Sequence, residues 1–173
     1  MLTLVYGGSA SGKSEYAEQL ACASAGPRYY IATMQPYGAS AKARIQKHRA
    51  ERAGKNFQTL ECYTGLDTLM LPRRGTVLLE CMGNLVANEL FWPEGAGAES
   101  PERIRAGISN LLRQTGNLIV VSNDVFREGL FYGQETIHYL KVLGGLNEFL
   151  ARQADRVVEV VCGIPLAVKG ELP

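Results

Sequence analysis

Histidine and cysteine are scarce in this sequence, and those present do not form a metal-binding pattern. The 173 residues contain two histidines and four cysteines, and no two cysteines form a C-x-x-C pair. Because zinc sites need closely spaced cysteine and histidine ligands, we expect no zinc site. Scattered cysteines favour free thiols in a reducing compartment, so the predicted location is cytoplasmic.

Long apolar runs and a large net charge of either sign are also missing. No segment approaches the roughly 20 apolar residues of a membrane span, and the apolar start ends at two glycines without a basic leader. The formal net charge of +1 gives no indication of a nucleic-acid or membrane-surface partner. The length of 173 residues predicts a single domain over residues 1–173.

Short apolar runs alternate with stretches of helical character. Runs rich in β-branched, aromatic or leucine residues predict strands at 2–6, 29–32, 57–62, 76–81, 118–122 and 157–162. Helices are expected from Ser14 to about Ala25, after Ser40 as N-cap, and after Ser100 as N-cap with Pro101 as the first helical residue. This alternation predicts an α/β fold, a three-layer sandwich with a mainly parallel sheet.

A glycine-rich motif follows the first predicted strand and matches G-x-x-x-x-G-K-[ST]. It consists of Gly7, Gly8, Ser9, Ala10, Ser11, Gly12, Lys13 and Ser14. Backbone N–H groups of such a loop surround phosphate oxygens, and the N-terminus of the following helix adds partial positive charge. Lys13 can then reach the β and γ phosphates, and Ser14 can ligate Mg²⁺. The motif therefore predicts a nucleotide site.

An acidic residue at a strand end is the second candidate ligand for magnesium. Glu80 follows a short apolar run, so its carboxylate should emerge at the carboxyl edge of the sheet, where ligands of open α/β folds bind. The alternative is an ordinary strand-end glutamate in a cap or salt bridge, and Asp67 and Asp124 are weaker candidates. These features alone define only a kinase, another nucleotide-using enzyme or a nucleotide-controlled switch.

A basic helix carries one of the two histidines. Spacing of four residues places Arg44, His48 and Arg52 on one helix face. Neighbouring guanidinium groups should favour neutral imidazole, which can attack the α-phosphorus of a nucleoside triphosphate and expel pyrophosphate. A solvated helix face is the alternative, and periodicity does not decide between them. His138 lies on a mainly apolar helix and is given no role.

The two motifs together resemble the signature of the adenosylcobinamide kinase and adenosylcobinamide-phosphate guanylyltransferase family. That signature joins G-G-x-x-S-G-K-S to a later R-I-x-x-H-x-x-x-R, and residues 7–14 and 44–52 match both without a gap. The second motif is the more family-specific one. The resemblance continues through residues 30–33, 59–61, 78–81, 121–123, 147–155 and 163–165, and so spans nearly the whole chain.

The resemblance implies a RecA-like P-loop NTPase sandwich, a homotrimer and two reactions. These are phosphorylation of the aminopropanol hydroxyl of adenosylcobinamide and transfer of GMP from His48 to that phosphate, giving adenosylcobinamide-GDP. GTP, ATP and Mg²⁺ are the implied cofactors, a corrinoid is the implied partner, and His48 and Lys13 are the implied catalytic residues. The implied nucleotide-binding residues outside the glycine-rich motif are Ile31, Ala32, Thr33, Arg49, Ala50, Glu51, Arg52, Glu61 and Glu80.

The second half of the chain departs from the family pattern. Residues 123–129 replace N-E-V-G-x-G-x-x-P, and residues 137–148 keep only part of R-x-F-R-D-x-x-G-x-x-N-Q. Phe57 stands where the family often has tryptophan. Two alternative hypotheses follow: a generic P-loop small-molecule kinase in which His48 only binds phosphate, or a nucleotide-binding relative without catalytic activity.

Overall fold

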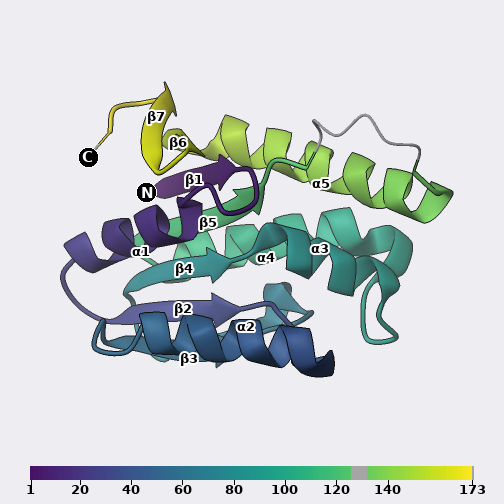
Figure 1. The fold of residues 1–173 in the computed structure, drawn as a ribbon, viewed down its shortest axis with the longest axis horizontal. Helices are drawn as coiled ribbons and strands as arrows, with labels where there is room; N and C mark the ends of the chain where they lie inside the picture. The colour runs from purple at the N-terminus through teal and green to yellow at the C-terminus, as the bar shows by residue number, and fades with distance from the viewer. Residues whose placement is uncertain (126–131, 173) are drawn as a thin grey trace.

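A sheet of seven strands runs through the computed structural model, which describes residues 1–125 and 132–172 (Figure 1). The strand order is β3-β2-β4-β5-β1-β6-β7, and the first six strands of the chain are parallel. Their bounds are β1 (Leu2–Gly7), β2 (Arg28–Ala32), β3 (Phe57–Glu61), β4 (Thr76–Glu80), β5 (Asn117–Asn123) and β6 (Arg156–Val161). The predicted mainly parallel sheet is confirmed.

Helices cover both faces of this sheet and complete the three predicted layers (Figure 1). On one face lie α1 (Lys13–Ala23) and α2 (Gly38–Glu51). The other face is covered by α3 (Met82–Phe91), α4 (Ser100–Gln114) and α5 (Gln134–Gln153). Within the described ranges, no helix is long and apolar enough to cross a membrane.

The apolar core is divided by the sheet into two clusters. The larger cluster includes Leu85, Ile108 and Leu146 from α3, α4 and α5, and the smaller one includes Ala17 of α1. Central strands are buried on both faces, as Val77, Leu78 and Leu79 of β4 show. This two-sided burial is why the strands read as continuous apolar runs rather than alternating ones.

The seventh strand, β7 (Ile164–Lys169), was not predicted from the sequence. It pairs antiparallel with β6 through a tight turn in which Cys162 has a φ of 50° and Gly163 a φ of 81°. Pro165 interrupts the β pattern, but a proline is tolerated on an edge strand because one side needs no ladder hydrogen bond. Local β propensity therefore does not predict this strand.

Two predicted helix caps are wrong. Helix α2 begins at Gly38 with Tyr37 as the N-cap, so Ser40 lies inside its first turn. Helix α4 begins at Ser100 itself with Glu99 as the N-cap. There the short helix η2 (Gly97–Glu99) leads directly into α4, so α4 begins one residue earlier than predicted. A second short helix, η1 (Leu66–Thr68), lies between β3 and β4.

Candidate nucleotide site

The glycine-rich loop joins β1 to α1, and two of its positions require glycine. Gly12 has a φ of 90°, and a Cβ there would lie 3.1 Å from the Cα of Gly163. A Cβ on Gly7 would lie 2.5 Å from the carbonyl oxygen of Val160. The Gly163 N–H also donates to the carbonyl oxygen of Ser11 at 2.8 Å. The end of β6 and the turn between β6 and β7 thus pack against the glycine-rich loop.

Polar side chains at the end of the glycine-rich loop lie close to the carboxylate at the end of β4. The Lys13 ammonium donates to the Gly8 carbonyl oxygen at 2.9 Å, and the Ser14 hydroxyl donates to Glu80 Oε1 at 2.5 Å. Burial raises the pKa of the Glu80 carboxyl, and the Ser14 hydrogen bond partly opposes this. Among the described residues, the buried Glu80 Oε2 has no hydrogen-bond partner.

Ser14 and Glu80 are therefore adjacent, as predicted, and present a hydroxyl and a carboxylate to one point. Mg²⁺ prefers oxygen ligands and is commonly bound through one or two protein side chains plus phosphates and water. A divalent cation here would also compensate the buried carboxylate, including its unpaired oxygen. The described chain contains no cluster of three or more histidine, cysteine, aspartate or glutamate side chains that would hold a metal without phosphates.

A cavity of 880 Å³ opens over the glycine-rich loop. Its floor consists of residues 9–14, and Arg44 and Lys47 of α2 line it together with Lys55. Lys55 is held in an ion pair with Glu18 of α1 at 2.5 Å. Glu15, Glu18 and Glu80 also line this cavity, so Arg44 and Lys47 supply the positive charge beside the loop that a polyphosphate requires.

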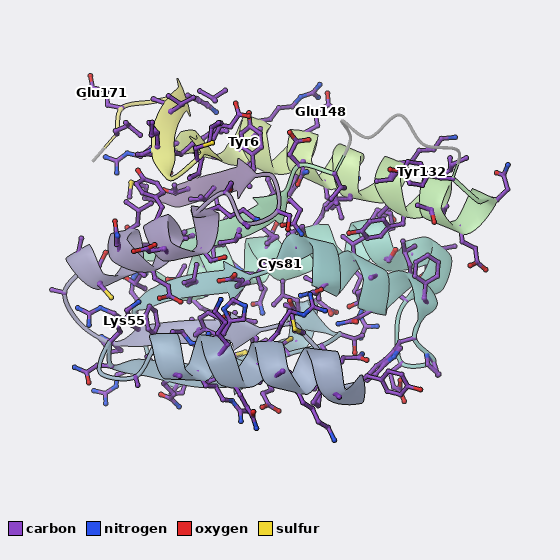
Figure 2. The ribbon with its side chains drawn as sticks, in the orientation of Figure 1. Tyr6, Lys55, Cys81, Tyr132, Glu148 and Glu171 are labelled. Atoms are coloured by element: carbon purple, nitrogen blue, oxygen red, sulfur yellow. The ribbon has the colours of Figure 1, made fainter. Side chains whose placement is uncertain are left out.

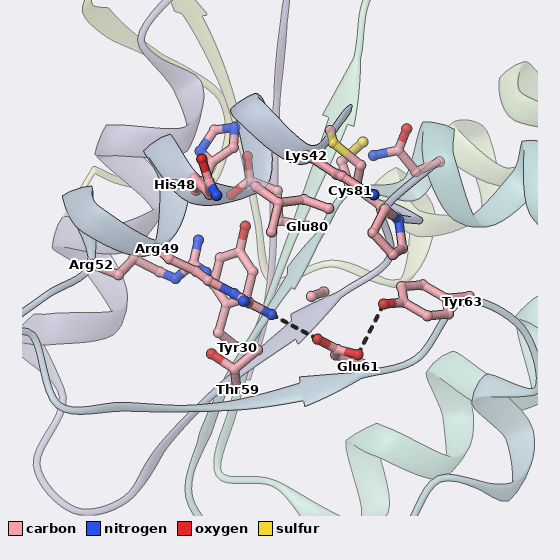
Figure 3. Close-up of a pocket in the computed structure, with 16 residues that line it drawn as sticks. Tyr30, Lys42, His48, Arg49, Arg52, Thr59, Glu61, Tyr63, Glu80 and Cys81 are labelled. Atoms are coloured by element: carbon pink, nitrogen blue, oxygen red, sulfur yellow. Dashed lines mark hydrogen bonds and ion pairs between the residues drawn. The ribbon is translucent and has the colours of Figure 1, made fainter. Parts of the chain in front are cut away.

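A second cavity of 250 Å³ lies between α2 and the ends of β2 and β3 (Figure 3). Glu61 lines it and accepts hydrogen bonds at both oxygens, from Arg49 Nη2 and from the Tyr63 hydroxyl, each at 2.9 Å. The Arg52 guanidinium lies 3.4 Å from the centre of the Tyr30 ring. The site therefore combines aromatic surface, a fixed carboxylate and cations.

His48 lies where the two cavities meet. It lines both of them, as does Glu80, while Arg44 lines only the larger cavity and Arg52 only the smaller one. The predicted basic face of α2 is thus turned toward the glycine-rich loop rather than toward solvent alone. A nucleotide with its base in the smaller cavity and its phosphates in the larger one would place its α-phosphate near His48.

Some of the predicted nucleotide-binding residues do not line either cavity. Thr33 is fully buried, and its hydroxyl donates to the Cys81 carbonyl oxygen at 2.9 Å and accepts from the Cys81 N–H at 2.7 Å. Ile31 is equally buried in β2, whereas its neighbour Ala32 lines the smaller cavity. Ala50 is exposed on α2. Direct nucleotide contacts of Ile31, Thr33 and Ala50, and of Glu51 at the end of α2, stay predictions.

Other outcomes concern the weaker candidates and the departures from the family pattern. Asp67 forms an ion pair with Arg103 at 3.1 Å and does not line either cavity. Residues 126–129, where the family pattern is lost, lie outside the described residues. Sequence reasoning missed Tyr63 and Lys55, which belong to no motif and reach the site only through strand pairing and loop packing.

A mainly parallel sheet, with a glycine-rich loop after its first strand and a basic helix opposite, is the arrangement of a P-loop NTPase-like α/β protein. Comparison with known proteins then assigns the family. Residues 3–168 match the family described as cobinamide kinase / cobinamide phosphate guanyltransferase, and the chain belongs to this family. Family membership places the chain among NTP-dependent kinases and nucleotidyltransferases of cobalamin biosynthesis.

Three curated relatives agree with this assignment over almost their whole length. The bifunctional adenosylcobalamin biosynthesis protein CobU of Salmonella typhimurium is 33% identical over 183 aligned residues, covering 98% of this chain and 100% of the relative. The protein of the same name from Escherichia coli is 32% identical, with 98% and 100% covered. The bifunctional protein CobP of Pseudomonas aeruginosa is 31% identical, with 99% of each chain covered.

Proposed function

We propose that this chain phosphorylates adenosylcobinamide and then transfers GMP from GTP, through His48, to give adenosylcobinamide-GDP. The observation that carries the proposal is the position of His48 between the larger cavity, which opens over the glycine-rich loop, and the smaller cavity with its aromatic and carboxylate groups. His48 is partly buried at this position, whereas Arg44 and Lys47 on the same helix are exposed. Family membership supports the same pair of reactions.

In the guanylyl step, an unprotonated imidazole nitrogen of His48 attacks the α-phosphorus of GTP. The new N–P bond forms as the bond to the bridging oxygen breaks, and pyrophosphate leaves. An oxygen of the acceptor phosphate then attacks the same phosphorus, and the N–P bond breaks to regenerate neutral imidazole. Arg44 and Lys47 line the larger cavity, into which the leaving pyrophosphate would move, and their charges would stabilise the pyrophosphate.

In the kinase step, Lys13 and the loop N–H groups hold the β and γ phosphates of ATP or GTP while the acceptor hydroxyl attacks the γ-phosphorus. The bond from the γ-phosphorus to the β–γ bridging oxygen breaks as the new O–P bond forms, the nucleoside diphosphate leaves, and the hydroxyl proton passes to solvent. Such transfers depend mainly on positioning and charge stabilisation. Ser14 and Glu80 would hold Mg²⁺, which neutralises charge on the phosphates when bound. For Lys13 this step requires exchanging its present contact with the Gly8 carbonyl for phosphate oxygens.

We further infer that the protein works in the cytoplasm as a homotrimer. Four free cysteines among the described residues support a reducing compartment. The edge strand β7 exposes Ile164 and Leu166, 62% and 46% accessible, and exposed apolar edges of this kind are commonly covered by another chain.

The guanylyl step is tested by intact-mass measurement after incubation with Mg²⁺, GTP and pyrophosphatase. The wild-type protein should gain the mass of one GMP in an acid-labile linkage, and His48→Ala and His48→Asn should gain none. His138→Ala is the matched control, because His138 is exposed on α5 and lines none of the cavities described above. It should be labelled as the wild type is.

An assay of cobinamide phosphorylation, run beside the mass measurement, separates the rival hypotheses. A kinase in which His48 only binds phosphate would form no adduct, yet would still phosphorylate its acceptor in the His48→Ala variant. A nucleotide-binding relative without catalytic activity would bind GTP and turn over no cobinamide. Absence of an adduct in wild-type protein that demonstrably binds GTP would refute the proposed guanylyl transfer.

A further inference from the structure

A third cavity, of 460 Å³, lies on the opposite side of the sheet from α1 and α2. Leu4 of β1, Val157 of β6 and Val168 of β7 form its apolar wall. Residues of α5 form the facing wall, and Tyr6 and Glu148 lie on this part of the molecule (Figure 2). The volume is within the range of small-molecule sites. No step proposed so far uses this cavity.

This cavity and the larger cavity over the glycine-rich loop share one lining residue. Asn123, the last residue of β5, lines both spaces. The next residue, Asp124, also lines the cavity, and its N–H donates to the Gly7 carbonyl oxygen at 2.9 Å, which ties this strand end to the start of the glycine-rich loop. A ligand in this cavity could therefore approach the larger cavity over the glycine-rich loop at Asn123.

The polar groups around the cavity suit amides and hydroxyls rather than phosphates. No basic side chain belongs to its described lining, while Asp124 and Glu148 do. Glu148 is paired with Arg152 at 2.5 Å, and an anionic ligand would find no basic side chain among the described residues that line the cavity, so a second nucleotide is disfavoured. Asn147 accepts the Ser122 hydroxyl at its Oδ1 at 2.6 Å, which leaves its amide N–H groups to donate to a ligand carbonyl.

We propose that this cavity binds the amide-bearing edge of the corrinoid acceptor, next to the arm whose hydroxyl receives the phosphoryl group. The inference rests on the proposed function for the identity of the acceptor. Primary amides both donate and accept hydrogen bonds, and so match the asparagine and carboxylate groups, while methylene and methyl groups match the wall of Leu4, Val157 and Val168. The macrocycle itself is much larger than the cavity and remains outside it.

Filling the cavity is the test, with adenosylcobinamide binding measured by equilibrium dialysis. Val168→Trp adds bulk from a position that is 58% exposed, so it can occupy the cavity without disturbing the core. Ala167→Trp is the matched control, because Ala167 is exposed on the same strand but does not line the cavity. We expect the dissociation constant to rise about tenfold or more in Val168→Trp and to stay at the wild-type value in Ala167→Trp.

Each outcome supports or overturns the assignment. Wild-type binding in the folded Val168→Trp variant, or no corrinoid binding by the wild type, overturns it. If Val168→Trp does not fold or changes its oligomeric state, Ala151→Leu fills the same cavity from α5 and is judged by the same criterion. GMP labelling of His48 is measured on all variants, because its absence refutes the proposed function while corrinoid binding still reports on the cavity.

Discussion

At the scale of single residues, two neighbours orient the Glu61 carboxylate. One oxygen accepts from Arg49 and the other from Tyr63, and the Tyr63 ring packs edge-on against Trp92 with centroids 6.3 Å apart. Each carboxylate oxygen keeps a second lone pair. Guanine presents two adjacent N–H donors on one edge, which a carboxylate held in this way can accept together, whereas adenine lacks that pair.

We therefore predict that Tyr63→Phe weakens GTP binding about threefold to tenfold and leaves ATP binding unchanged. The variant keeps the ring but loses the hydrogen bond that orients Glu61, a loss of about 1 kcal/mol. Titration calorimetry with both nucleotides measures the effect. Tyr37→Phe is the control, because Tyr37 is 88% exposed. An equal loss for GTP and ATP would contradict a role in base selection.

The cysteines differ in reactivity for reasons of burial. Burial raises the pKa of Cys62 to about 11 and also raises that of Cys81, whereas Cys162 is exposed in the turn before β7. Only the thiolate reacts with iodoacetamide, so a shift of two pKa units lowers the reactive fraction about a hundredfold. At pH 8, peptide mapping should find Cys162 modified and Cys62 intact, with Cys62 labelling rising toward pH 11. Equal labelling at pH 8 would show that Cys62 is accessible and unshifted.

At the scale of elements, a buried acid joins three segments that have no strand pairing between them. The Glu89 side chain in α3 is fully buried and accepts from the N–H groups of Gly65 at 2.7 Å and Ala96 at 3.0 Å. Arg103 of α4 lies 3.6 Å away as its counter-ion. The carboxylate thus connects the loops beside η1 and η2 to the helical layer behind the nucleotide site.

Glu89→Gln should lower the free energy of unfolding by about 2 to 4 kcal/mol. The amide removes the charge that faces Arg103 from the buried side and leaves it only the ion pair with Asp67, and one of the amide's two polar groups is a donor facing a backbone donor. Urea unfolding measures the change. Glu102→Gln on α4 is the control, since Glu102 is 71% exposed and its loss should cost no more than about 0.5 kcal/mol. Similar values for the two variants would show that the buried contacts contribute little.

At the scale of the whole molecule, the exposed face of β7 is the feature most suited to association. Leu166→Glu places a charge on this apolar edge, and we expect it to shift the protein from trimer toward monomer in light-scattering measurements. Ala167→Glu, on the same strand, should retain the wild-type mass if the contact uses the Ile164 and Leu166 side chains. A monomeric wild-type protein would refute the proposed trimer.

Much of this architecture was predictable because its signals are local. The apolar run before Gly7, the glycine-rich motif and the spacing of Arg44, His48 and Arg52 each lie within one segment, and their expected strand, loop and helix are present. Continuous apolar strands also indicated the parallel, doubly covered sheet. Ser14 and Glu80, the two predicted magnesium ligands, lie in hydrogen-bond contact because parallel strands bring their carboxyl ends to one edge.

Other features depend on segments that meet only after the chain has folded. β7 forms because an edge position tolerates Pro165, and Tyr63 reaches Glu61 through the loop after β3. The cavity below Asn123 needs β1, β6, β7 and α5 at once. Local patterns therefore predicted the class of fold, which is confirmed, and the glycine-rich loop and the candidate nucleophile, whose roles stay predictions. Long-range packing established where His48 lies and which cavities it joins, because those positions depend on contacts between residues far apart in the chain.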